Sequence, residues 1–109
     1  MKILRNYFLP VLVLTLAIMW VGCNKDDDND QVVAAFTFVI GENPGEVTFS
    51  NQSQNADVYT WNFGDATNST MINPVHFYEE NDSFIVVLKA QGKAGSGSVQ
   101  DTVVVNNIP

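Results

Sequence analysis

The sequence predicts an all-β fold for its last three-quarters, a β-sandwich of about six or seven short strands. Two observations carry this prediction. Apolar and polar residues alternate with a period of two in short runs, which is typical of a strand with one buried face. Clusters of Gly, Pro, Asn and Asp separate the runs, as turns do. No stretch there sustains the 3.6-residue apolar period of a helix.

The first half of this region predicts three strands. They are expected at residues 34–40, 46–50 and 58–63. The turn cluster 41–45 separates the first two, and a polar loop precedes the third. Since side chains alternate across a strand, each strand has one apolar face. The residues on these faces are Phe36, Phe38 and Ile40 in the first strand, Val47 and Phe49 in the second, and Tyr59, Trp61 and Phe63 in the third.

The second half predicts a tight turn at residues 64–66, a polar loop and four further strands. They are expected near residues 69–72, at 75–78, at 83–90 and at 98–106. The Gly-rich segment 92–97 is expected to form a hairpin loop between the last two strands.

At the third strand the sequence resembles a known family. The run Trp61-Asn62-Phe63-Gly64-Asp65 resembles the Trp-Asp/Asn-Phe-Gly-Asp-Gly signature of PKD domains, which are Ig-like sandwiches of extracellular and bacterial surface proteins. Residues 73–78, with His76 and Tyr78, resemble the family's Asn-Pro-x-His-x-Tyr segment, and residues 84–90 its Tyr-x-Val-x-Leu-x-Ala strand. The resemblance covers residues 32–106 and implies an Ig-like β-sandwich of about seven strands.

Three positions depart from the family pattern. Ala66 stands in place of the last glycine of the signature and would strain the turn if that position needs a positive φ. Asp82 replaces a glycine, which is a milder change because Asp tolerates the left-handed region. Phe84 replaces a tyrosine and so loses a hydroxyl group.

The N-terminus predicts export. Residues 1–22 combine a basic start with an apolar stretch from Phe8 to Val21, as a secretory signal peptide does. Cys23 follows and is the single cysteine of the chain, which resembles the lipobox of bacterial lipoproteins although Trp20 is bulky for its position. That resemblance implies cleavage before Cys23 and a covalent lipid on it, with no other cofactor. The alternative is an uncleaved membrane anchor with a buried or free thiol.

The charge limits the possible partners. The chain carries −7, and removal of residues 1–22 with their Lys and Arg leaves 109 − 22 = 87 residues and a charge of 3 − 12 = −9. Nucleic acid is therefore not expected as a partner, because binding there requires Lys and Arg to neutralise phosphates. Adsorption to an anionic bilayer is disfavoured for the same reason, so a lipid would have to supply the membrane contact.

Residues 23–31 form an acidic tether. Its first part resembles the export signal of surface lipoproteins in some Gram-negative bacteria and implies a place on the outer face of the outer membrane. The residues that carry this resemblance are Asn24, Lys25, Asp26, Asp27 and Asp28. The alternative is a solvated spacer without a signal. The run lacks the ligand spacing and turn glycine of a calcium loop, so no metal site is expected.

Candidate catalytic residues are few. His76 is the single histidine, without a second metal ligand or an evident nucleophile, so a packing role at a strand edge is favoured. Asp65 is expected to accept backbone N–H groups in the signature turn. Trp61 could stack on a sugar, but its alternation with Tyr59 and Phe63 favours the core.

A candidate interaction patch lies on the opposite face of the later strands. If Phe84 and its alternating neighbours point inward, Ile85 and Val87 point outward. The same parity sends Val58 and Val104 outward, and a contiguous apolar patch marks an interaction surface. The alternative is that these residues only favour strand formation.

Together these features predict a non-enzymatic cell-surface lipoprotein that binds or spaces through contacts with an unknown surface protein or glycan. The alternative is an accessory subunit of a surface glycan-capture complex. A fragment of a modular hydrolase is less favoured, because the expected 87 mature residues (109 − 22) leave no room for a catalytic domain.

Overall fold

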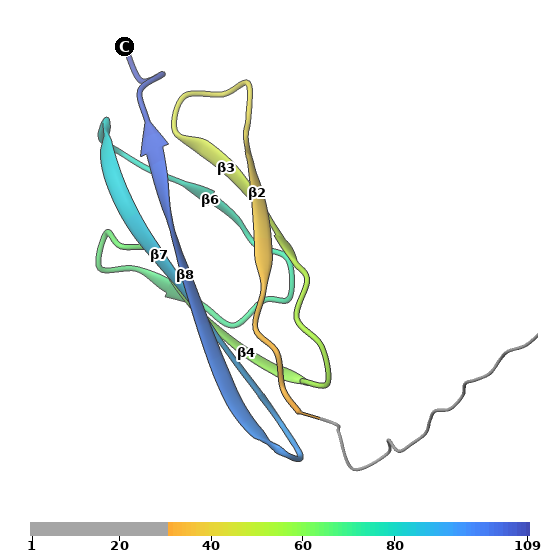
Figure 1. Cartoon of the computed structure of the whole chain (residues 1–109). Helices are drawn as coiled ribbons and strands as arrows, with labels where there is room; N and C mark the ends of the chain where they lie inside the picture. Colours follow the sequence, from red (N-terminus) through yellow and green to blue (C-terminus); the bar gives the residue numbers. More distant parts are fainter. Residues whose placement is uncertain (1–30) are drawn as a thin grey trace, which may run out of the picture. The chain divides into compact units, whose positions relative to one another are not determined.

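The computed structural model describes residues 31–109, and the expected signal peptide, Cys23 and the acidic run 24–28 lie outside the described residues. Seven strands and no helix occur in the described part (Figure 1). They are β2 (Phe36–Ile40), β3 (Glu46–Asn51), β4 (Val58–Asn62), β5 (Asn68–Ser69), β6 (Val75–Phe77), β7 (Asp82–Gly92) and β8 (Gly95–Val105). It follows that residues 31–109 contain no helix that could cross a membrane.

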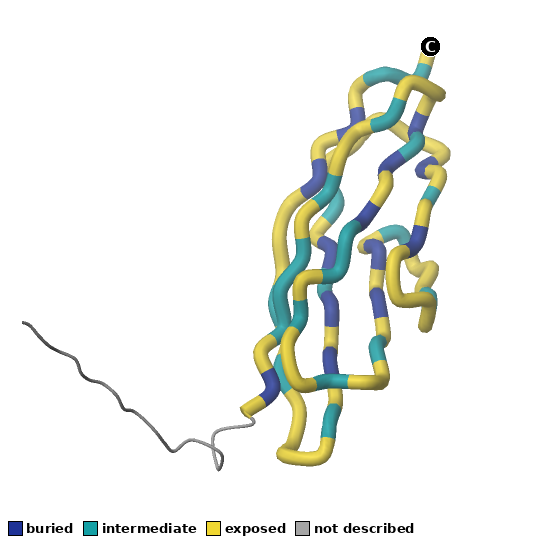
Figure 2. The backbone as a smooth tube through the Cα atoms, turned by 90° about the vertical axis from the view of Figure 1, so that its right-hand side faces the viewer, coloured by how far each residue is buried: buried dark blue, intermediate teal, exposed yellow. Residues whose placement is uncertain are grey.

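The strands form two antiparallel sheets. The smaller sheet has the order β2-β3-β6 and the larger one the order β5-β4-β7-β8. The expected sandwich of about seven strands is thereby confirmed, with β4, β7 and β8 as neighbours in one sheet. The two sheets bury their facing sides, which gives the alternation of buried and exposed positions along each strand in Figure 2.

The core lies where the apolar faces of the two sheets meet. Its fully buried large side chains include Trp61, Phe49, Leu88, Val47, Val86 and Val103. Most predicted inward residues are therefore correctly placed. Ile40 is the exception: it ends β2 and leaves 41% of its surface exposed, because the sandwich does not extend over it.

Trp61 occupies the centre of this core. Its ring lies 5.2 Å from that of Phe36 and 5.3 Å from that of Phe49, so it contacts the opposite sheet. Its indole Nε1 donates to the carbonyl oxygen of Met71 at 2.9 Å, which satisfies the one polar group of the side chain. The residue is 0% exposed, so the structure agrees with the core role and leaves no ring face for a sugar.

The hairpin of β7 and β8 is longer than the sequence predicted. The two strands pair without interruption from Asp82↔Val105 to Gly92↔Gly95, so only Lys93 and Ala94 lie in the turn. The prediction of a loop over residues 92–97 was wrong, because glycine also occurs within strands where another backbone approaches closely. Gly92 instead belongs to the strand, where a Cβ would lie 2.2 Å from the carbonyl oxygen of Asn55.

Strand β8 forms one edge of the larger sheet and pairs with β7 alone. Asp101 lies in the middle of this edge strand. Its Oδ1 accepts the backbone N–H of Thr102 at 2.8 Å, so this main-chain donor is already satisfied within the strand. Asp101 lies on the same side of the strand as the buried Val103 and Val105, although its own side chain is exposed.

Candidate functional site

The signature turn follows β4 and depends on Gly64. Its φ is +87°, and a Cβ at this position would lie 2.6 Å from the carbonyl oxygen of Ile85 in β7. Both facts require glycine, since any other residue would clash with the β7 backbone in a strained conformation. The Gly64 N–H donates to Asn62 Oδ1 at 3.0 Å, which tightens the turn. This explains why Asn62 and Gly64 occur together in the sequence.

Ala66 has a φ of +72°, in the left-handed region. The sequence predicted strain at this position if a positive φ was required, and the structure shows that it is. Asp82, by contrast, does not have a positive φ, so the second departure from the family pattern carries no such strain.

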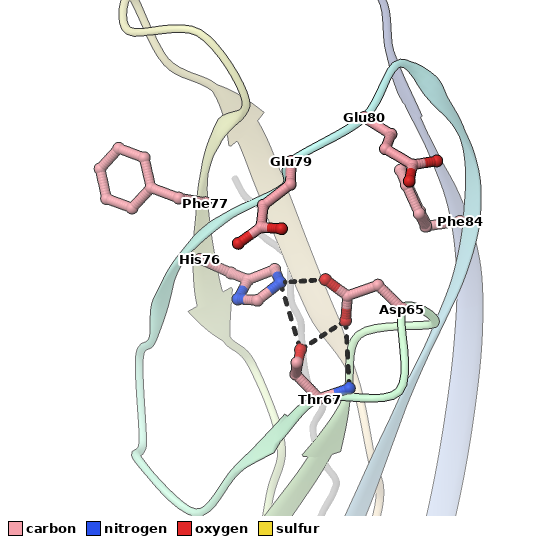
Figure 3. A pocket seen from close by; sticks show the side chains of 7 residues that line it. All are labelled: Asp65, Thr67, His76, Phe77, Glu79, Glu80 and Phe84. Atoms are coloured by element: carbon pink, nitrogen blue, oxygen red, sulfur yellow. Dashed lines mark hydrogen bonds and ion pairs between the residues drawn. The ribbon is translucent and has the colours of Figure 1, made fainter.

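The Asp65 carboxylate contacts three polar groups around the turn (Figure 3). Its Oδ1 accepts the Thr67 backbone N–H at 3.2 Å and also the Thr67 hydroxyl. Its Oδ2 lies 2.7 Å from His76 Nε2 on β6. The predicted backbone contact of Asp65 is therefore present. Its contact with His76, which brings together two sheets, was not predicted.

His76 is held rigidly by aromatic rings. It stacks on Phe63 with ring centroids 4.1 Å apart and an interplanar angle of 7°, and it meets Tyr78 edge-on at 4.5 Å. The Tyr78 hydroxyl donates to the Phe63 carbonyl oxygen at 2.7 Å in a buried position. The signature residues Phe63, His76 and Tyr78 thus lock the end of β4 against β6, in agreement with a packing role.

Two pKa shifts follow from this arrangement. Burial alone would raise the pKa of Asp65, but the hydrogen bonds from Thr67 and His76 and the attraction of the imidazole lower it below 3.8. The carboxyl group is therefore ionised at neutral pH. Burial, and to a smaller extent the negative charge of Asp65, raise the pKa of Tyr78, so its hydroxyl stays protonated and remains a donor.

The cluster superficially resembles a catalytic triad, but its geometry is wrong for one. In a triad the orienting carboxylate and the nucleophile contact opposite nitrogens of the imidazole ring. Here Asp65 and Thr67 both contact Nε2, at 2.7 and 3.3 Å, and Thr67 donates its hydroxyl to Asp65. Nor do residues 31–109 contain a group of three His, Cys, Asp or Glu side chains placed to hold a metal ion.

A cavity of about 360 Å³ opens beside this cluster. Figure 3 shows the side chains around it, contributed by the signature turn, by β6, by the segment that leads into β7 and by β7 itself. The lining residues are Asp65, Thr67, His76, Phe77, Glu79, Glu80 and Phe84. Sequence reasoning did not identify Glu79, Glu80 or Phe77, whose only signal was their closeness to the family's His-x-Tyr segment.

The candidate interaction patch divides into two parts. Ile85 and Val104 are 54% exposed and Val87 is half-buried, all three on the outer face of the larger sheet. Val58 is also exposed, but it pairs with Gln91, whereas Val87 pairs with Asn62. The polar row of Thr60, Lys89 and Ser98 therefore separates Val58 from the other three, and the expected contiguity was wrong at that residue.

A second exposed apolar group lies on the outer face of the smaller sheet. Val39 and Val75 flank Thr48 in one row, and Phe77 lies beside Glu46 in the next. Phe77 is 54% exposed, which is unusual for a large aromatic residue. The parity of β2 and β6 would have located these residues, but without the strand register their closeness could not be seen.

Known proteins resemble the described region. The family model of the PKD domain matches residues 29–106. The PKD1 domain of the Vibrio cholerae metalloprotease PrtV has a similar structure, with a TM-score of 0.64 and 29% identity over 69% of this chain and 96% of that domain.

Two collagenases match in part. Collagenase ColA of Bacillus cereus is 42% identical over 55 residues, which are 49% of this chain and 6% of the collagenase. Collagenase ColQ1 of the same species is 44% identical over 46 residues, which are 42% of this chain and 5% of the collagenase. The matched segment is thus a small part of each of these relatives.

Proposed function

Because the chain belongs to the PKD domain family, whose members are commonly extracellular modules, we propose that it is a non-enzymatic module that binds or spaces through protein or carbohydrate contacts outside the cell. One observation carries the proposal. The single histidine of the chain, His76, is bound to the signature turn. Asp65 and Thr67 both contact its Nε2 atom. An imidazole held in this way supports the fold and activates no nucleophile.

The proposal includes a lipid anchor at Cys23. The support is the apolar segment before this residue, its place as the only cysteine, and the acidic run after it. The calculated mature charge of 3 − 12 = −9 would repel an anionic bilayer, so a lipid is the attachment that fits this chain. The acidic run would then place the domain on the outer face of the outer membrane.

An experiment on intact cells tests this placement. External protease is expected to remove the domain from wild-type cells and to spare a variant in which Asp26, Asp27 and Asp28 are replaced by Ala. Intact-mass measurement of the membrane protein is expected to show the loss of residues 1–22 and added acyl mass, and Cys23→Ser is expected to release the protein. Equal digestion of both forms would refute the export signal, and an unmodified full-length chain would refute the anchor.

The partial match to two collagenases favours a second candidate function. There the similar segment accompanies a much longer chain, of which it is 6% and 5%. The domain would then be an accessory subunit of a surface complex, such as one for glycan capture, or a module of a larger hydrolase. Purification from solubilised membranes distinguishes these roles: a co-purifying glycan-binding protein or hydrolase supports the accessory role, and a protein that purifies alone supports the independent module.

A further inference from the structure

The cavity beside the signature turn lies toward the acidic end of the domain. That end contains the β2–β3 loop, the β6–β7 connection and the C-terminus (Figure 1). Five of the acidic side chains of the domain occur there: Glu42, Glu46, Glu79, Glu80 and Asp82. Lys93 lies at the other end, in the β7–β8 turn, where Gln31 and Asn55 also meet. The cavity therefore opens in the most negative part of the described chain.

Three of the five polar residues that line the cavity are carboxylates, which are acceptors when ionised. The ionised Asp65 carboxylate can only accept, so the hydrogen between it and His76 must be on Nε2. The Thr67 hydroxyl and backbone N–H both donate to Asp65. These two donors are thus already committed within the cluster.

Two further carboxylates stand at the mouth of the cavity. Glu79 and Glu80 are exposed side chains on the connection into β7, and Figure 3 shows Glu79 near His76 and Glu80 near Phe84. Within residues 31–109 neither forms an ion pair, since the ion pair there joins His76 and Asp65. Carboxylates that lack a cation within their own domain remain available to one from outside.

The walls of the cavity are partly aromatic. Phe84 stacks on Tyr78 with ring centroids 4.2 Å apart and also lines the cavity, as does Phe77. An aromatic ring beside carboxylates is suited to a cation that carries an apolar stem. A volume of about 360 Å³ is at the small end of ligand pockets, which fits one side chain better than a run of sugar rings.

We propose that this cavity binds the side chain of a lysine on a partner protein, with the ammonium group between Glu79 and Glu80 and the stem against Phe84. The proposal rests on the proposed function, since it names the partner chemistry of an extracellular binding module. An ammonium group is positively charged and only donates, which complements the carboxylates that line the site.

The test uses the full-length protein in detergent micelles, labelled with ¹⁵N, and follows backbone amide shifts at constant ionic strength. The probe is Nα-acetyl-lysine amide, and the matched neutral probe is Nα-acetyl-norleucine amide. Saturable shifts are expected at the signature turn and along residues 76–84 with the lysine probe alone. The Glu79→Gln and Glu80→Gln double variant is expected to bind about fivefold to tenfold more weakly, the size expected for two partly exposed ion pairs.

A control variant separates the site from the general negative charge of this end. Glu42→Gln with Asp82→Asn removes the same two charges from residues that do not line the cavity. It is expected to bind the lysine probe as wild type does. An equal loss of binding in this control, equal shifts with the norleucine probe, or no saturable shift would overturn the proposal. Saturable shifts with glucose alone would replace it with a carbohydrate site.

The two proposals can fail separately. If partner proteins still co-purify with the Glu79→Gln and Glu80→Gln variant in wild-type amounts, the cavity is not the contact, although the domain remains a binding module. If no partner co-purifies with wild type while the lysine probe binds as expected, the site stands and the proposed partner-binding function is wrong.

Discussion

Replacing Ala66 by glycine should stabilise this domain. Ala66 has a φ of +72° and an exposed side chain, so its methyl group costs conformational strain without packing against the core. A non-glycine residue in the left-handed region costs roughly 1–2 kcal/mol. Part of that amount is offset, because glycine raises the conformational entropy of the unfolded chain and thereby destabilises the folded state by roughly 0.5–1 kcal/mol. The net stabilisation expected for Ala66→Gly is about 0.5–1 kcal/mol.

Urea unfolding, followed by the fluorescence of the buried Trp61, would measure this change. For a domain of this size about 1 kcal/mol corresponds to a rise in Tm of roughly 4–8 °C, so thermal unfolding gives a second measurement. Ala94→Gly is the matched control. Ala94 is also exposed and lies in the β7–β8 turn, but its φ is not positive, so glycine should destabilise there. If both variants lose stability alike, Ala66 is not strained in the folded domain and the reasoning is refuted.

Three further predictions follow from the core, the turn and the outer face. Trp61→Ala should lower the free energy of unfolding by about 3–5 kcal/mol, as deletion of a large buried aromatic side chain does, and a stable variant in an equilibrium unfolding experiment would contradict the core role. The pKa of Asp65 is lower in the folded than in the unfolded state. The ionised Asp65 therefore stabilises the domain fully above its unfolded-state pKa, and this stabilisation is lost as pH falls through its folded-state pKa. The stability difference between wild type and Asp65→Asn, measured by urea unfolding, should therefore shrink below about pH 4, and parallel curves would refute this. Replacing Ile85 and Val87 by Thr should change unfolding little, since Thr keeps strand preference, while co-purification or self-association weakens; large destabilisation would contradict the outward placement.

The strand faces could be predicted because period-two alternation depends only on local sequence. Trp61 and Val86 were correctly expected inward, and Ile85 outward, since one residue fixes the parity of its whole strand. Register is different, because it depends on which residues of two distant strands meet. Val58 was therefore placed beside Val87, although a polar row separates them.

The candidate site was harder to predict than the fold. Asp65 and His76 were each assigned a local role, and their 2.7 Å contact depends on the packing of one sheet over the other. The cavity beside them has no sequence signature, because Glu79 and Glu80 look like an ordinary charged connection until β7 folds back beside the signature turn. Pairwise contacts across a sandwich are set by tertiary structure, and a single sequence does not contain them.

The edge strand β8 has a consequence for molecules held close together. An edge strand of this length offers outward N–H and C=O groups on which a neighbouring copy could add a strand, and so extend the sheet from one molecule to the next. Asp101 opposes this in two ways. Its carboxylate accepts the Thr102 backbone N–H, which is then not free to bond a new strand. Its charge also lies on the inward-facing side of the edge strand, where a continuing sheet would have to bury it. In a crowded layer the value of Asp101 therefore lies in keeping neighbours separate, a property that the stability of the isolated domain does not reveal.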